Sequence, residues 1–107
     1  MARNLGQKTE RRILKKIGAK RQPMSGAISG FPNDGVKGRY LLEIKSTERK
    51  SLGIKSIWLW ELDENAVSRN KIPALIMVFN HGETLQTQWV AIPMRDFERL
   101  TKNWAKS

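Results

Sequence analysis

The stretch Tyr40-Leu41-Leu42-Glu43-Ile44-Lys45-Ser46-Thr47 decides the fold of this chain, and we interpret residues 39–47 as a β-strand. Along it, one set of side chains alternates with another: Tyr40, Leu42 and Ile44 against Leu41, Glu43 and Lys45. Because residues i and i+2 of a strand point to the same face, Glu43 and Lys45 project together while Ile44 points into the core. The pattern predicts a mostly buried strand that carries one acid-base pair.

The segments around this strand alternate between helical and extended patterns. Residues 9–17 indicate a basic helix ended by Gly18, residues 54–68 a second helix and residues 96–105 a closing helix. A short strand is expected near residues 27–28, and residues 73–79 and 88–92 are expected to pair as a hairpin. The predicted order is α-β-β-β-α-β-β-α, and the fold class is α/β, with a small mixed β-sheet flanked by helices.

Composition excludes several classes of protein. The chain has 107 residues, which suits one domain over residues 1–107, and it has no cysteine, which rules out disulfides, thiolate zinc sites and a cysteine nucleophile. It has no apolar run of the ~20 residues that a bilayer span needs, and its first residues lack the apolar stretch of a secretory signal. We therefore expect a cytoplasmic protein with no membrane association and no small-molecule cofactor.

Charge points to the kind of partner. Twenty basic residues against ten acidic ones give a net charge of +10, and Glu10 is the only acid among the first 22 residues. Such an excess in a small domain usually persists because the partner is a polyanion, so nucleic acid is the expected partner. A solvated basic arm and a membrane surface are the alternatives, but the segment lacks the aromatic anchors of an interfacial helix.

The candidate chemistry lies in Asp34, Glu43 and Lys45. Two nearby carboxylates can hold a hard divalent ion such as Mg²⁺, which can bind a phosphate and lower the pKa of a bound water. The Lys45 ammonium would orient that water or neutralise developing charge. Taken alone, these residues favour a plainer interpretation, because an acid-x-Lys pair is common on a solvated sheet and Pro32-Asn33-Asp34-Gly35 has the composition of a turn.

Motifs along most of the chain give these residues a context. They are the basic first helix with its lone acid Glu10, the loop Met24-Ser25-Gly26-Ala27, Asp34, the strand of residues 40–47, Ser51-Leu52-Gly53-Ile54-Lys55 leading into Trp58-Leu59, and Pro73-Ala74-Leu75. In these motifs the sequence resembles the PD-(D/E)xK nucleases, in particular the small archaeal-type and phage-encoded Holliday junction resolvases. It departs from them at Asn33 and Met24, where glycine is common, and at Gly35, where an apolar residue is usual.

The resemblance implies a single PD-(D/E)xK nuclease domain with a restriction-endonuclease-like core and a basic N-terminal helix. It also implies dependence on Mg²⁺, with Mn²⁺ as a substitute, and a homodimer that nicks branched DNA symmetrically, leaving 5′-phosphate and 3′-hydroxyl ends. Carried over by position, Asp34 and Glu43 look like metal ligands and Lys45 like the catalytic lysine. Glu10 resembles the helix acid that completes the metal site; alternatively, it only pairs with basic neighbours on its own helix.

Basic and polar residues near these motifs are the candidate DNA contacts, as phosphate contacts position DNA without reading its bases. Lys50 and Lys55 flank the start of the second helix, where free N–H groups favour an anion. The full set is Arg11, Arg12, Lys15, Lys20, Arg21, Gln22, Ser25, Lys50 and Lys55. Ordinary surface charge, and for Ser25 a hydroxyl that caps a turn, are the alternatives.

Three functions remain open. The first is a metal-dependent, structure-selective endonuclease that resolves four-way DNA junctions. The second is a nicking or repair endonuclease of the same fold acting on flaps, mismatches or duplex, and the third is a non-catalytic basic DNA-binding protein. Trp60 has no obvious partner on the second helix, and it is expected either to mark an association surface or to be covered by the closing helix.

Overall fold

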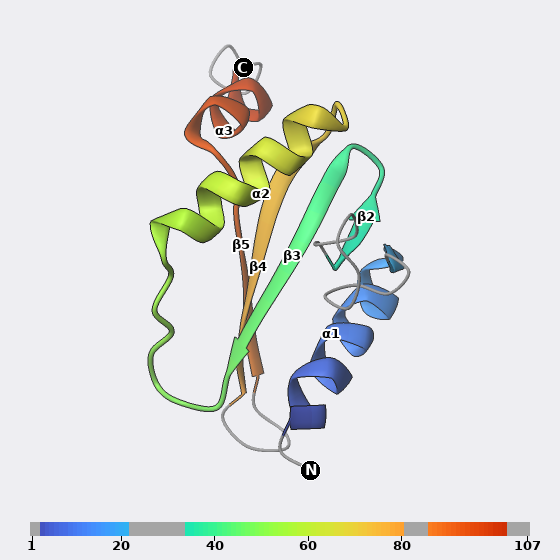
Figure 1. Cartoon of the computed structure of the whole chain (residues 1–107), viewed down its shortest axis with the longest axis vertical. Coiled ribbons are helices and arrows are strands. Elements are labelled where there is room, and N and C mark those ends of the chain that lie inside the picture. Colours follow the sequence, from blue (N-terminus) through green and yellow to red (C-terminus); the bar gives the residue numbers. More distant parts are fainter. Residues whose placement is uncertain (1–2, 22–33, 81–85, 103–107) are drawn as a thin grey trace.

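The structure, a computed structural model, describes residues 3–21, 34–80 and 86–102 (Figure 1). Its elements are α1 (Arg3–Ile17), β1 (Lys20–Arg21), β2 (Gly35–Lys37), β3 (Tyr40–Thr47), α2 (Ser56–Ser68), β4 (Ile72–Asn80), β5 (Gln86–Ala91) and α3 (Met94–Thr101). The α/β class is confirmed, and the elements follow the predicted order, although β1 lies where no strand was predicted. The short strand expected near residues 27–28 lies outside the described residues, and the first strand found is β1.

The strands form one mixed sheet in the order β1-β2-β3-β4-β5. β3 and β4 are parallel neighbours joined through α2, with Tyr40 opposite Ile72 and Thr47 opposite Phe79, whereas all other neighbouring pairs are antiparallel. The expected hairpin is confirmed as β4 and β5. A parallel pair needs a crossover connection, and this one is supplied by a helix.

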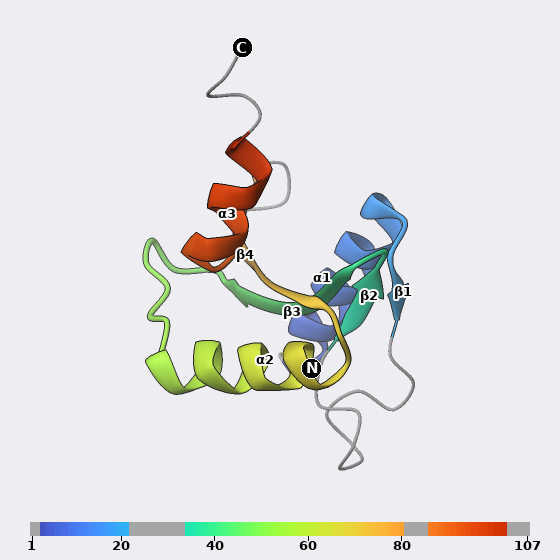
Figure 2. The ribbon, with the colours of Figure 1, turned by 90° about the horizontal axis from the view of Figure 1, so that it is seen from above.

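Helices cover the two faces of this sheet (Figure 2). The face under α1 has a buried cluster of Ile13, Leu14, Leu42, Ile44, Ala74, Ile76 and Val78. The face under α2 has a buried cluster of Leu41, Leu62, Ala66 and Leu75. Alternate residues of β3 and β4 thus enter different clusters, which explains why these strands read as nearly continuous apolar runs.

The helix bounds differ from the predicted ones mainly at their starts. α1 begins at Arg3 rather than residue 9, and it ends as expected where Gly18 adopts a φ of 71°. The amide of Ala19 donates to the carbonyl of Leu14 over 2.8 Å, which closes the last turn. α2 begins at Ser56 instead of residue 54, and α3 begins at Met94 instead of residue 96.

The closing helix α3 leaves its large apolar side chains exposed. Phe97 and Leu100 are both more than half exposed, and Trp104 lies outside the described residues. α3 is tied to α2 instead by an ion pair between Arg95 and Asp63. α3 leaves Trp60 57% exposed. Within the described ranges, no helix combines the length and apolarity needed to span a bilayer.

Candidate active site

The acid-base pair of β3 forms as its spacing predicted. The Glu43 carboxylate lies 3.6 Å from the Lys45 ammonium, with side chains 19% and 30% exposed respectively. Ile44 between them is buried in the cluster under α1. The strand therefore fixes an acid and a base side by side on one face through its period of two residues.

Asp34 lies at the start of β2 and faces β3 rather than solvent. Its backbone amide donates to the Leu42 carbonyl over 2.9 Å, and its Oδ2 accepts a hydrogen bond from the Ile44 amide over 2.6 Å. The residue is only 8% exposed. These contacts hold the carboxylate against the backbone of β3, so the turn-like sequence around Asp34 does not carry its side chain outward.

Glu10 reaches the same place from α1. Its pKa is raised from an ordinary 4.5 to about 7, chiefly because burial disfavours the charged form and because the Asp34 carboxylate lies beside it and shares a hydrogen bond. Glu43 adds a smaller effect in the same direction, while the Arg21 guanidinium opposes it. Glu10 of α1 therefore lies against Asp34, and Glu43 of β3 is close enough to affect its charge.

Trp58 of α2 completes the surroundings of Lys45. The Lys45 ammonium lies 4.3 Å from the centre of the indole ring, and the Lys55 ammonium lies 5.7 Å from the same ring. The ring and the Glu43 carboxylate together hold Lys45 in place, because a cation is attracted to both. The sequence analysis named Trp58 only in the motif that ends in Trp58-Leu59 and did not predict its contact with Lys45; that motif was the signal that Trp58 belongs near the site.

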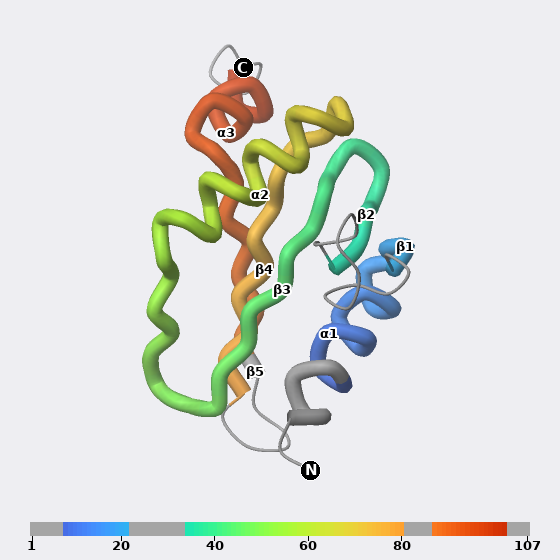
Figure 3. Tube along the Cα trace, viewed as in Figure 1, coloured from blue at the N-terminus to red at the C-terminus, as the bar shows by residue number. Residues whose placement is uncertain are grey.

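Gly35, one of the departures from the family pattern, is explained by packing. A Cβ at this position would lie 2.7 Å from Cδ2 of Leu14 and 2.8 Å from the backbone oxygen of Lys20. The Leu14 side chain therefore occupies the space that an apolar side chain after Asp34 would fill. Figure 3 shows how closely β2 passes the end of α1 and β1. Asn33 and Met24, the other two departures, lie outside the described residues.

The donor set suits a hard cation, although the side chains do not enclose one. No three acidic or histidine side chains within the described ranges are grouped so that they could hold a metal ion. Mg²⁺ usually keeps several waters and takes only one or two protein carboxylates together with substrate phosphates. The carboxylates of Asp34 and Glu43 are therefore the oxygen ligands that Mg²⁺ or Mn²⁺ would take here, and Glu10, whose pKa is raised by burial and by Asp34, is the nearby third acid.

The structure places most of the expected DNA-binding residues on two surfaces. Arg11, Arg12 and Lys15 are exposed on α1, and Lys20 and Arg21 are exposed on β1, where Arg21 is close enough to influence Glu10. Lys50 is exposed in the loop before α2, and Lys55 is the residue that precedes this helix. Gln22 and Ser25 lie outside the described residues.

Compared with protein-family models, curated proteins and solved structures, the chain matches none. The assignment of this site therefore depends on the chain's own residues and on their arrangement.

Proposed function

We propose that this protein is a metal-dependent, structure-selective DNA endonuclease of the PD-(D/E)xK type, with four-way junctions as its substrate. One observation carries the proposal. Lys45 lies 3.6 Å from Glu43 on one face of β3, Asp34 is anchored on the Ile44 amide of the same strand, and Asp34 and Glu43 both raise the pKa of Glu10. The same residue types, in the same order along the chain, are those that the nuclease resemblance implies.

Each residue has a role that follows from its chemistry. Asp34 and Glu43 would hold the divalent ion, which when bound supplies Lewis-acid polarisation of the scissile phosphate. Lys45 would donate a hydrogen bond to the attacking water or to a phosphate oxygen. Glu10, with a pKa of about 7, would hold or release a proton within the physiological range. Trp58 would position Lys45 without taking part in the reaction.

The charge of the surrounding surface supports a DNA substrate. α1 and β1 present exposed lysines and arginines on the elements that also supply Glu10 and Arg21 to the site. Phosphates held along these elements would bring the backbone of the DNA to the carboxylates. Because contacts of these lysines and arginines to phosphates carry no sequence information, recognition would follow the shape of the branch.

A cleavage assay on a four-way junction tests the catalytic assignment. We expect Glu43→Gln and Lys45→Met each to lower the Mg²⁺-dependent rate by at least about 100-fold, as is typical when a group that stabilises the transition state is removed. Junction binding in EDTA should stay within about threefold of the parent protein for Lys45→Met, since one of many phosphate-facing charges is lost. Glu64→Gln and Lys102→Met, on exposed residues of α2 and after α3, are the matched controls.

A panel of substrates separates the remaining possibilities. A junction resolvase should cut the four-way junction in preference to a flap, a mismatch or linear duplex, in Mg²⁺ or Mn²⁺. Preferred cutting of a flap or a mismatch would make it a repair endonuclease of the same fold. DNA binding with no cleavage of any substrate in either metal would contradict the proposal and leave a basic DNA-binding protein.

A further inference from the structure

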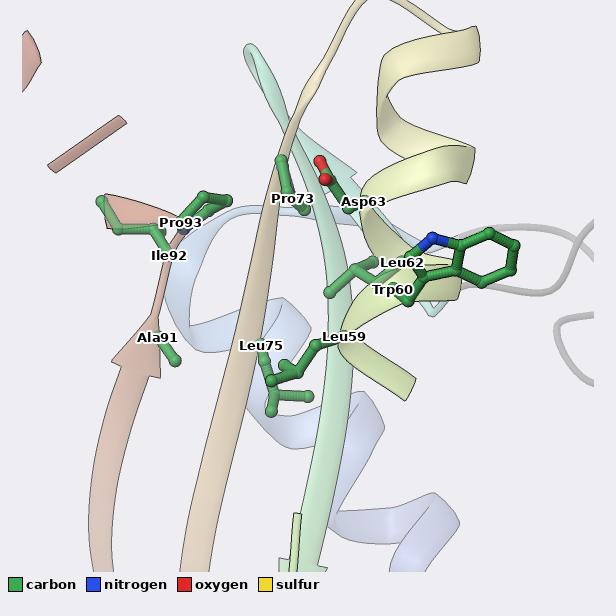
Figure 4. A pocket seen from close by; sticks show the side chains of 9 residues that line it. All are labelled: Leu59, Trp60, Leu62, Asp63, Pro73, Leu75, Ala91, Ile92 and Pro93. Atoms are coloured by element: carbon green, nitrogen blue, oxygen red, sulfur yellow. The ribbon is translucent and has the colours of Figure 1, made fainter. Parts of the chain in front are cut away.

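A groove of about 290 Å³ lies on the α2 face of the sheet, between α2 and the end of β5 (Figure 4). Leu59 and Leu62 of α2 line one wall, Ala91 and Pro93 line the other, and Leu75 of β4 lies at the floor. Small-molecule sites usually have about 300–1,000 Å³, so this groove is at the lower end of that range. Its size and apolar walls suit one or two side chains of another protein chain.

Two exposed tryptophans lie close to this groove. Trp89 is two residues before Ala91 in β5, so both side chains project to the α2 face, and Trp89 is 64% exposed. Trp60 borders the groove with its ring turned outward (Figure 4). Gln88 projects to the opposite face, where Lys16 of α1 donates a hydrogen bond to it over 3.1 Å. The apolar surface around the groove therefore belongs to the α2 face alone, and large exposed apolar surfaces often bind proteins.

The two basic residues of α3 are already paired with acids of α2 and α3. The Arg95 guanidinium binds the Asp63 carboxylate beside the groove, and its Nε lies 3.7 Å from Oδ2 of Asp96. Nη1 of Arg99 lies 3.9 Å from Oδ1 of Asp96. The positive charge of α3 is therefore neutralised within these two helices.

The remaining acids give this side of the molecule its charge. α2, β5 and α3 together contain two basic and five acidic residues, a net charge of −3, whereas the whole chain carries +10. Glu61, Glu64 and Glu98 are exposed, and none of them forms an ion pair with another described residue. Lys55 precedes α2 and Lys102 follows α3, so the negative charge lies between them. A basic partner would be attracted here and repelled by the exposed lysines and arginines of α1 and β1.

The basic elements of a second copy do not have the apolar side chains that this groove requires. Ile13 and Leu14 of α1 are each 2% exposed because they pack in their own core, and Ile17 packs against the same cluster. β1 consists of Lys20 and Arg21 alone. These elements offer positive charge without an available apolar side chain, so the groove fits a different chain better.

We propose that the groove binds a basic segment of another protein. One or two large apolar side chains of that segment would enter the groove between Leu59 and Ala91. Lysines or arginines on either side of them would face the negative charge of α2 and α3. A few apolar side chains held in a pocket usually supply most of the affinity of such an interface, while the charges orient the partner and speed its association.

The partner and the DNA would approach from different sides. α1 covers one face of the sheet and α2 covers the other (Figure 2), so a segment bound beside α2 would leave the exposed bases of α1 free. The interaction does not depend on catalysis. Its measurement in EDTA without DNA can therefore fail or succeed independently of the cleavage assay.

A phage-displayed library of random peptides of about 12 residues, selected on the parent chain in EDTA at moderate salt, supplies the probe. We expect the enriched peptides to share one or two large apolar residues flanked by lysines or arginines. A selected peptide, labelled with a fluorophore, then gives a Kd by fluorescence anisotropy. A selection that enriches no peptide, or that enriches only neutral or acidic ones, would overturn the proposal.

Substitutions on α2 locate the contact. Leu59→Asp should raise the Kd of the selected peptide at least about tenfold, because it places a charge in the apolar wall of the groove. Ile57→Asp is the matched control, since Ile57 lies on the same helix outside the groove and is 48% exposed against 44% for Leu59. Equal effects of the two variants on the Kd would contradict binding in the groove.

Two further measurements test the charge and the identity of the partner. Glu64→Gln combined with Glu98→Gln should raise the Kd about fivefold at low salt and less at high salt, as expected for screened charges. An unchanged Kd would show that the acids do not select the partner. Sedimentation of the parent chain and of Leu59→Asp tests the other occupant, because a dimer that Leu59→Asp dissociates would mean that a second copy fills the groove and that the proposal is wrong.

Discussion

At the scale of single residues, the site depends on one unusual carboxyl. Glu10 has a pKa near 7 because burial and the neighbouring Asp34 carboxylate both disfavour its charged form. A divalent ion would relieve this crowding and displace the proton, so metal binding should tighten as pH rises through about 7. Glu10 is the acid whose role was hardest to assign from the sequence. The release of its proton should therefore indicate that a metal ion has bound.

This shift predicts how stability depends on pH. In EDTA, the folded protein keeps the Glu10 proton up to about pH 7, whereas the unfolded chain releases it near 4.5. The folded state thus binds more protons between these values, so its stability should fall as pH rises through this window. Glu10 is partly exposed, so solvent screening should keep the change to about 1 kcal/mol.

Thermal unfolding between pH 5 and 8 measures this effect. Glu10→Gln should flatten the decline of Tm with pH, while Glu98→Gln, an exposed acid on α3, should leave it as in the parent chain. A parent Tm that rises through the window, or a slope that Glu10→Gln leaves unchanged, would contradict the assigned pKa.

The residues also show what sequence can reveal about a site. Glu43 and Lys45 were predictable together because a strand repeats every two residues, and this local rule needs no knowledge of the rest of the fold. The contact of Glu10 with Asp34 joins α1 to the start of β2, and no periodicity encodes such a distance. Trp58 lay on an apolar stripe, so its contact with Lys45 could be found only once α2 was placed over β3.

At the scale of elements, long periodic segments were predicted well and their ends less so. β3, β4, β5 and α2 appear where the alternation and the helical stripe placed them. The starts of α1 and α3 extend beyond the predicted limits because basic and polar residues continue a helix as readily as apolar ones. The sequence predicted α3 without indicating what its apolar residues contact, since an amphipathic pattern shows that a helix has an apolar face but not what lies against that face.

α3 allows a prediction of its own. Asp96 in its first turn is 4% exposed and lies 3.7 Å from Nε of Arg95 and 3.9 Å from Nη1 of Arg99. An acid at this end of a helix also interacts favourably with the helix dipole. Asp96→Ala should therefore lower the free energy of unfolding by about 1–2 kcal/mol.

Urea unfolding measures this change, with Glu98→Ala on the exposed side of the same helix as the control. Cleavage well below Tm should be the same for Asp96→Ala as for the parent chain, since the residue lies on a different element from the candidate site. An Asp96→Ala variant as stable as Glu98→Ala would show that the buried carboxylate contributes nothing.

At the scale of the whole molecule, net charge differs between the elements, although exposed basic residues such as Lys50, Lys55 and Lys102 also lie outside α1 and β1. α1 and β1 carry exposed basic side chains, while α2, β5 and α3 together carry a net −3. DNA affinity should therefore fall steeply with salt, and each lost phosphate contact should reduce the slope of log K against log salt by about 0.9.

Salt titrations of binding in EDTA test this arrangement. Arg12→Gln on α1 should lower the slope by about 0.9, whereas Arg99→Gln, on an arginine of α3 that is also exposed, should leave it unchanged. Equal losses for both variants would mean that DNA surrounds the molecule instead of lying along α1.

Gly35 has no functional group, yet it sets the separation of two layers. Only a hydrogen atom fits between this residue, Leu14 and the Lys20 backbone. Gly35→Ala would add one methyl group at this position. The methyl group would push α1 away from the sheet and would move Glu10 away from Asp34. The relative positions of Glu10 and Asp34 therefore depend on the size of the side chain at position 35 as well as on the two acids themselves.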